Sequence, residues 1–302
     1  MKSRYLIILG LLSNTLSAVI AILRLNRMTK IGFSILIPIL MLAIFADYIA
    51  PYSPYEQVGP PFSPPSSKYL LGTNDLGQDI LSEVIYGARI SLLVGLIVAL
   101  VSVSIGTVVG VISGYFGGVV DEILMRLTDA LLSIPALLFV IFLMSLIMRI
   151  GGYVSFYSTA IVIGLILWPG IARLVRSRVL SIRESLYIES AIAVGASTSR
   201  IIFKHILPNT VSTIIPVAVM HIARAILIEA TLSFLGLGDP TVKSWGTIIH
   251  YAFERNAIIL GMWWWFIPPI VLITLLTFSI YLIGIGLEEY YNPRLRSNIR
   301  QV

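Results

Sequence analysis

The chain has 302 residues, of which 57% are hydrophobic and 12% are charged, with a mean hydropathy of +0.94 and a formal net charge of +6. Soluble domains are about 45–50% apolar and about 25% charged, so this composition excludes an ordinary soluble domain and indicates an integral membrane protein. The sequence contains no cysteine, which excludes disulfides, thiolate nucleophiles and cysteine-ligated zinc.

An apolar run at 5–23 opens the chain, within an amino-terminal segment at 1–30. Two basic residues precede the run, as in a signal peptide. Cleavage after it would leave the basic residues that follow on the outside, against the cytoplasmic bias of Lys and Arg. An interfacial helix and an additional membrane span therefore remain as the two alternatives for this run.

Six later segments are long and apolar enough to cross a bilayer, which takes about 20 residues of helix. They lie at 31–50, 88–114, 130–150, 156–175, 211–236 and 264–287. The pattern predicts an all-α integral membrane fold with a core of six helices. The first core helix lies at 31–50, and the other five lie within 88–287. In the second segment Gly106, Gly110 and Gly114 recur every four residues, which predicts close backbone approach by a neighbouring helix.

Basic residues gather before the first span, between the fourth and fifth spans, and in the tail at 288–302. Six spans place all three groups on one side of the cell membrane, so the core amino terminus and the carboxy terminus are predicted to be cytoplasmic. The loop at 51–87, which carries six prolines between Pro51 and Pro65, is then extracytoplasmic. Its length predicts a surface that contacts an external molecule.

The connection at 179–208 is polar, but its apolar residues recur at helical spacing. Gly195 suits a left-handed turn, and Pro208 suits the first turn of the next span. These features predict a helix–turn–helix elbow on the cytoplasmic side, with Glu184 and Glu189 available to a partner. The alternative is a solvated loop.

This connection resembles the EAA loop of ABC importer permeases, which reads Glu-Ala-Ala, three residues, Gly, nine residues, Ile, any residue, Leu-Pro. The matching residues here are Glu189, Ala191, Gly195, Leu207 and Pro208, while a serine and a histidine replace one alanine and the isoleucine. Further stretches resemble the dipeptide/oligopeptide/nickel branch, and specifically the second of its two permeases. They are LGTNDLGQDILSEVIYGARISLLVG, DEILMRLTDALLSIPALL, WPGIARLVRSRVLSIRESLYIESAIAVGAS and EATLSFLGLG.

The resemblance implies that the elbow couples the permease to a cytoplasmic ATPase. It further implies a heterodimer with a related permease, two ATPase subunits and an extracytoplasmic binding protein. The sequence has no G-x-x-x-x-G-K-[ST] phosphate loop, so we expect a non-catalytic subunit without a cofactor. Peptides are the expected solute, and oligosaccharides or nickel are the alternatives within the same machinery.

Ionisable residues in or next to predicted spans are energetically expensive and mark a path or a buried pair. Arg126 and Asp129 accompany the third span, and Arg224 and Glu229 lie in the fifth. We predict gating or buried-charge roles for these four, with Glu122, Arg126 and Asp129 pairing along one helix face. An ion-coupled secondary transporter is the rival class, but the internal repeats typical of such transporters are not evident.

Overall fold

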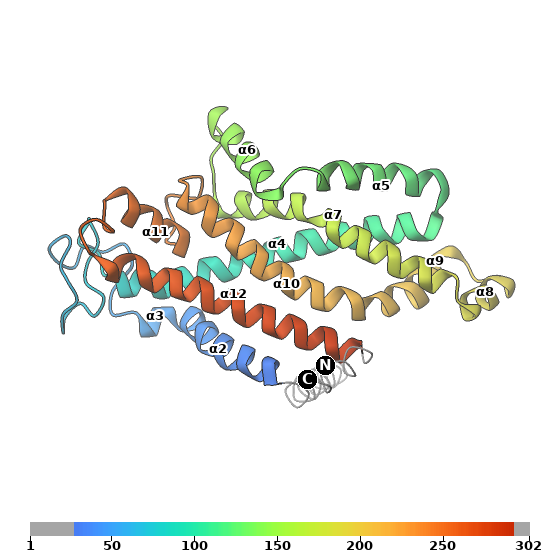
Figure 1. The fold of residues 1–302 in the computed structure, drawn as a ribbon, viewed down its shortest axis with the longest axis horizontal. Coiled ribbons are helices and arrows are strands. Elements are labelled where there is room, and N and C mark those ends of the chain that lie inside the picture. The colour runs from blue at the N-terminus through green and yellow to red at the C-terminus, as the bar shows by residue number, and fades with distance from the viewer. Residues whose placement is uncertain (1–26, 293–302) are drawn as a thin grey trace, which may run out of the picture.

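The structure is a computed structural model that describes residues 27–292, and its regular elements are all helices (Figure 1). The predicted run at 5–23 lies outside the described residues. The helices are α2 (Arg27–Ile44), α3 (Ala46–Ile49), α4 (Ile80–Phe116), α5 (Gly118–Leu132), α6 (Ala136–Arg149), α7 (Phe156–Arg183), α8 (Leu186–Ala193), α9 (Thr198–Ile201), the π-helical turn η1 (Ile202–Ile206), α10 (Leu207–Phe234), α11 (Trp245–Glu254) and α12 (Trp263–Tyr291).

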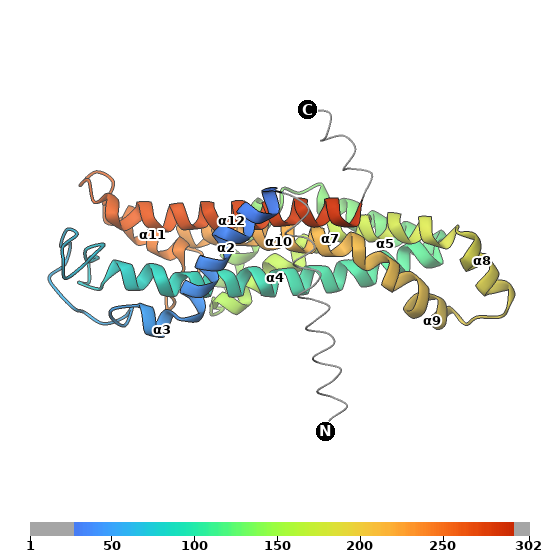
Figure 2. The ribbon, with the colours of Figure 1, turned by 90° about the horizontal axis from the view of Figure 1, so that it is seen from below.

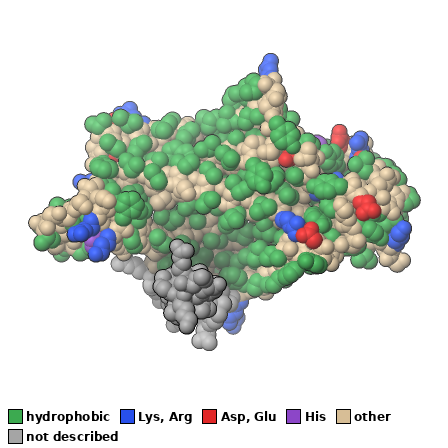
Figure 3. Space-filling view, turned by 180° about the vertical axis from the view of Figure 1, so that it is seen from behind, with side chains coloured by type: hydrophobic (Ala, Val, Ile, Leu, Met, Phe, Trp, Pro, Cys, Tyr) green, Lys and Arg blue, Asp and Glu red, His purple; other side chains and the backbone are tan. Residues whose placement is uncertain are grey.

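Within residues 27–292, five helical stretches are long and apolar enough to cross a membrane, and the bent pair α5–α6 makes a sixth. The five are α2, α4, α7, the continuous run from α9 to α10, and α12. The predicted all-α membrane fold is therefore confirmed. On the face in Figure 3, hydrophobic side chains cover most of the surface and charged side chains lie mainly toward the two ends, as expected of a protein whose solvent is lipid.

The bundle is elongated, and its two ends carry different structures (Figures 1 and 2). The long loop between α3 and α4 lies with α11 at one end, and α8 and α9 form the other end. Helix α2 runs obliquely across the bundle and packs on α12, where a Cβ added to Gly32 would lie 2.8 Å from the carbonyl oxygen of Ser279. We call these the loop end and the elbow end.

The prediction of one continuous helix at 130–150 is wrong. Helix α5 ends at Leu132, α6 begins at Ala136, and the two axes are bent by 84°. Pro135 explains the break, because proline has no amide hydrogen and disfavours helical backbone at the residue before it. Hydropathy alone does not register this break, since the residues on both sides are apolar.

The predicted start of the second span, residue 88, is also too late. Helix α4 begins at Ile80 because the Asp79 side chain accepts a hydrogen bond from the backbone N–H of Ser82 at 2.8 Å, as an N-cap does. The preceding loop therefore ends at residue 79 and is itself folded. The Tyr69 hydroxyl donates to the carbonyl of Val58 at 2.6 Å, for example, so the loop forms a compact cap on the bundle.

The three glycines of α4 lie against α7, as their spacing predicts. A Cβ at Gly106 would be 2.7 Å from the Cβ of Ile171, and one at Gly114 would be 2.8 Å from the Cβ of Val179. At Gly110 a Cβ would be 2.6 Å from the carbonyl oxygen of Ala172. The two helices therefore meet backbone to backbone along a glycine seam formed by these three residues.

We expect Gly110→Ala to destabilise the protein by about 1–3 kcal/mol, because the added methyl group overpacks a rigid backbone contact. Gly170→Ala is the matched control: it also replaces a helical glycine, but no atom lies within 4 Å of the new Cβ. Since alanine favours a helix over glycine by about 1 kcal/mol, the control should be neutral or stabilising. The midpoint of thermal denaturation of each purified variant measures its stability. Equal midpoints for the two variants would contradict a close contact between α4 and α7 at Gly110.

Candidate functional site

The polar connection predicted from the sequence forms a compact elbow between α7 and α10. Helix α8 ends in a Schellman motif, in which Gly195 N–H donates to Ile192 O at 2.9 Å and Ala196 N–H donates to Ala191 O at 3.0 Å. Gly195 has a φ of +82°, which is the left-handed conformation expected for it. Ser197 then caps α9 by accepting from the N–H of Arg200, and Pro208 lies in the first turn of α10.

Apolar side chains fix this elbow to the end of α7. Ile188, Ile201 and Ile206 are buried and belong to one cluster with Val179 and Ile182 of α7. Leu207 packs against the same cluster. The solvated-loop alternative is therefore wrong for this segment, because the elbow has its own buried core.

The outer surface of the elbow is unusually apolar for an end of the bundle. Leu186 is 80% exposed, Val194 is 86% exposed and Phe203 is 69% exposed. Large apolar side chains grouped on a surface mark contact sites for other molecules. The sequence did not single out these three residues, because their exposure depends on which face of each short helix packs on α7.

The predicted coupling residues differ in their surroundings. Glu184, which caps the end of α7, and Glu189, in the first turn of α8, are both exposed, as are Gly195 and Pro208. Ala191 is half-buried, and its carbonyl is used to end α8. The elbow thus presents two carboxylates and several apolar side chains on one short structure.

Two of the predicted membrane charges lie in exposed ion pairs. Arg126 pairs with Glu122 on α5 at 2.5 Å, as their spacing predicts. Asp129 does not join them: its carboxylate pairs at 2.5 Å with Arg173 of α7, so the prediction of a trio on one helix is wrong. The trio fails because α7 lies beside α5 and offers Asp129 a basic partner on another helix.

Glu229 and Arg224 lie on the same helix in opposite environments. Glu229 is 3% exposed and accepts a hydrogen bond from the Ser233 hydroxyl at 2.7 Å, while its other oxygen has no hydrogen-bond partner among the described residues. Arg224 is exposed and lines a small cavity at the α5–α6 bend. Glu229 is thus a buried carboxyl group that faces its own bundle, whereas Arg224 faces outward.

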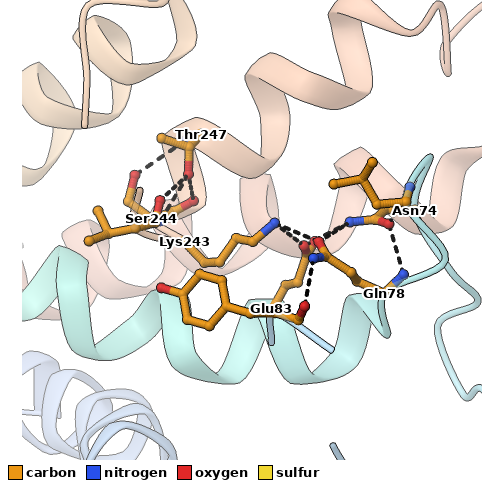
Figure 4. Close-up of polar contacts among 9 residues, drawn as sticks. Asn74, Gln78, Glu83, Lys243, Ser244 and Thr247 are labelled. Atoms are coloured by element: carbon orange, nitrogen blue, oxygen red, sulfur yellow. Dashed lines mark hydrogen bonds and ion pairs between the residues drawn. The ribbon is translucent and has the colours of Figure 1, made fainter. Parts of the chain in front are cut away.

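A buried polar cluster at the loop end was not predicted from the sequence (Figure 4). Lys243, just before α11, pairs with Glu83 in the first turn of α4 at 2.6 Å and donates to Gln78 Oε1 at 2.8 Å. The Asn74 amide donates to Glu83 at 2.8 Å and to Gln78 at 2.9 Å. The Glu83 residue is 1% exposed, so this cluster joins the loop, α4 and α11 in a site shielded from solvent.

Sequence reasoning missed this cluster for a physical reason. Asn74, Gln78 and Glu83 stand close together in the chain, but Lys243 is far away in sequence and only the fold brings it to them. A cavity of about 310 Å³ adjoins the cluster. In the part of the chain that the structure describes, no group of three or more His, Cys, Asp or Glu side chains is placed to hold a metal ion.

Comparison with known proteins gives consistent matches along the chain. The profile of a family described as "Binding-protein-dependent transport system inner membrane component" matches residues 106–297, and one described as "N-terminal TM domain of oligopeptide transport permease C" matches residues 16–65.

Three relatives show how far the similarity extends. The chain is 36% identical over 276 residues to the dipeptide transport system permease protein DppC of Bacillus subtilis strain 168, covering 91% of this chain and 84% of the relative. It is 36% identical over 277 residues to the oligopeptide transport system permease protein OppC of the same strain, covering 90% and 88%. It is 37% identical over 279 residues to DppC of Haemophilus influenzae strain Rd, covering 90% and 92%.

Proposed function

The chain belongs to the family of inner membrane components of binding-protein-dependent transport systems, and from this premise we propose that it imports peptides and that its elbow couples this import to ATP hydrolysis. It is a multi-pass permease component that has no catalytic role of its own, and it works with a binding protein and an ATPase.

The elbow is the coupling site in this proposal. It combines exposed carboxylates at Glu184 and Glu189 with the exposed apolar side chains of Leu186, Val194 and Phe203. A mixed surface of this kind, fixed to α7 by its own buried core, suits docking into a cleft on a soluble partner. This is the observation that carries the proposal, and the partner is one of two cytoplasmic ATPase subunits.

Peptides are the proposed solute because the relatives with the matches described above are named as dipeptide and oligopeptide permeases. Oligosaccharides and nickel are the alternatives within the same machinery. A second, related permease completes the path as a heterodimer. An extracytoplasmic binding protein delivers the solute to the loop end.

Reconstitution tests the function as a whole. The chain, its partner permease and the ATPase are placed in proteoliposomes with the ATPase outward, and the binding protein and a labelled peptide are enclosed. We expect peptide export from the lumen only with ATP and the binding protein present. Transport driven by an ion gradient without ATP would instead identify an ion-coupled secondary transporter and refute the proposal.

The orientation of the loop end gives a separate prediction. Ser66 is exposed in the loop, and the chain has no cysteine, so Ser66→Cys creates a single reactive thiol. We expect a membrane-impermeant maleimide to label it on intact cells, because the distribution of Lys and Arg along the chain favours an extracytoplasmic loop. Ser199→Cys in the elbow is the matched control and should react only after the membrane is opened. The reverse pattern would overturn the topology.

A further inference from the structure

Two cavities lie on the face formed by α7 and α10. The larger, of about 620 Å³, opens toward the elbow end and contacts α7, α10 and the end of α12. The smaller, of about 180 Å³, lies at the α5–α6 bend between α7 and α10. Both cavities are lined by α7 and α10. The positions of the lining residues on these two helices therefore show whether the cavities lie on the same helix faces.

The residues that line the two cavities fall on common stripes of α7 and α10. One stripe on α7 contains Leu167, Gly170, Leu174, Arg178 and Ser181, and one on α10 contains Thr213, Val217, Met220 and Arg224; each of these residues lines one of the two cavities. Successive residues in each series are three or four positions apart, so each series forms one stripe on its helix. We refer to the space between these stripes as the α7–α10 groove.

The elbow half of the groove is polar. Its lining includes Arg178 and Ser181 from α7, Ser212 and Thr213 from α10, and Glu288 from α12. The three residues from α7 and α12 lie just beyond the predicted ends of their spans, and the two from α10 lie at the start of the fifth span, so this half of the groove meets the polar boundary of the membrane. This half of the groove therefore suits an aqueous passage bounded by another subunit.

Arg224 lies at the other end of the groove, in the predicted fifth span, where an unpaired charge is costly. None of the ion pairs formed by residues 27–292 includes Arg224. Ten residues separate Arg224 from Phe234, the last residue of α10, which is about 15 Å along a helix. That distance is about half of a hydrocarbon core roughly 30 Å thick, and residue 224 falls at the middle of the span predicted at 211–236, so we expect it at mid-membrane depth.

The surroundings of Arg224 leave its charge without compensation inside the subunit. The cavity that it lines is otherwise apolar, with Leu131, Ile134, Pro135 and Leu167 among its walls. Gly170, opposite on α7, has no atom within 4 Å of an added Cβ, so space remains beside the guanidinium. An unpaired guanidinium beside an apolar wall attracts an anion more strongly than one surrounded by water.

We infer that Arg224 binds the carboxylate of the solute as it passes along the α7–α10 groove. A guanidinium presents two parallel N–H donors that match both oxygens of a carboxylate, and the apolar wall accommodates an adjacent hydrocarbon side chain. The inference rests on the proposed import function and narrows its solute to compounds with a free carboxylate. A metal cation is repelled at this position, and a neutral oligosaccharide leaves the charge uncompensated.

The test compares a tripeptide that has a free carboxyl terminus with the same tripeptide as its carboxamide, in the reconstituted complex. The import rate of each variant is divided by the wild-type rate for the same peptide. Any preference of the binding protein for one peptide then cancels. Arg224→Met should lower import of the free acid by about tenfold or more and leave import of the carboxamide unchanged. Arg224→Lys keeps the positive charge but lacks the two parallel N–H donors. Its import of the free acid should lie between those of the wild type and Arg224→Met.

Other outcomes overturn the inference. An equal loss for both peptides would assign Arg224 to gating or packing, and loss of the partner permease from purified complexes would assign it to an ion pair between subunits. A wild-type complex that imports neither peptide would refute the proposed function as well.

A second measurement keeps Arg224 intact. Thr213→Cys in the groove should react with a polar maleimide, whereas Leu165→Cys, at an exposed apolar position of α7, should not. Failure of Thr213→Cys to react would show that the groove holds no water.

Discussion

Replacing Gly195 with valine should reduce ATP-driven import by about tenfold, because the elbow then loses the turn between α8 and α9. Gly195 has a φ of +82°, and a left-handed backbone costs a branched residue roughly 1–2 kcal/mol. A free-energy change of this size alters an equilibrium roughly 5–30-fold, here between the docked and undocked elbow. Import, ATP hydrolysis and co-purification of the ATPase measure the effect.

The connection between α6 and α7 supplies a matched control. Gly151 also has a positive φ, +75°, and no atom within 4 Å of an added Cβ, as is true of Gly195. Gly151→Val therefore imposes similar backbone strain in the connection between α6 and α7, away from the elbow. It should leave ATPase association and coupling intact, and an equal loss in both variants would refute a specific role of Gly195.

Glu189→Lys tests the same docking surface through charge. The carboxylate is exposed in the first turn of α8, so its reversal should repel a basic group on the ATPase and uncouple hydrolysis from import. Glu56→Lys makes the same change at an exposed position of the loop end and should have no such effect. Full coupling in Glu189→Lys would place the docking contacts elsewhere on the elbow.

Lys243→Met should destabilise the protein by about 3–5 kcal/mol, because it leaves a buried carboxylate without its cation. The side chains of Glu83 and Lys243 are 2% and 14% exposed, and their ion pair measures 2.6 Å. Thermal denaturation of the purified transporter should show a large fall in the midpoint. The loop end should also become more sensitive to protease, since the cluster joins the loop to α11.

The double variant Glu83→Leu/Lys243→Met shows whether the loss of stability comes from the unpaired charge or from altered packing. Replacing both members of a buried pair by apolar residues is often neutral, and Asn74 retains its bond to Gln78, so much of the lost stability should return. Arg126→Met removes the cation of an exposed pair and should shift the midpoint little. If the double variant is as unstable as the single one, the ion pair is not the cause.

The sequence allowed the spans and the elbow to be predicted, because each depends on local chemistry. Runs of apolar residues define the membrane helices, and the glycine spacing from Gly106 to Gly114 indicates a close contact whatever the partner helix. The left-handed turn at Gly195 is likewise a property of a short segment. These predictions needed no knowledge of which helices are neighbours.

The remaining features depend on helix arrangement. The pairing of Asp129 with Arg173 and of Glu83 with Lys243 arises only when distant segments meet. The exposure of Leu186 and Val194 depends on which side of α8 rests on α7. Pro135 is a sequence signal for the bend, but the apolar residues on both sides of it led to the prediction of one continuous span.

The glycine seam has a mechanical consequence. Helix α4 has 37 residues, so it is a rod of about 55 Å that reaches from the elbow end to the buried cluster at Glu83. Because α7 lies against it backbone to backbone and leads through a short turn into α8, neither helix can slide or roll on the other without a steric collision. Because no side chains separate the two backbones along the seam, a force applied at α8 would reach α4 through rigid backbone contacts.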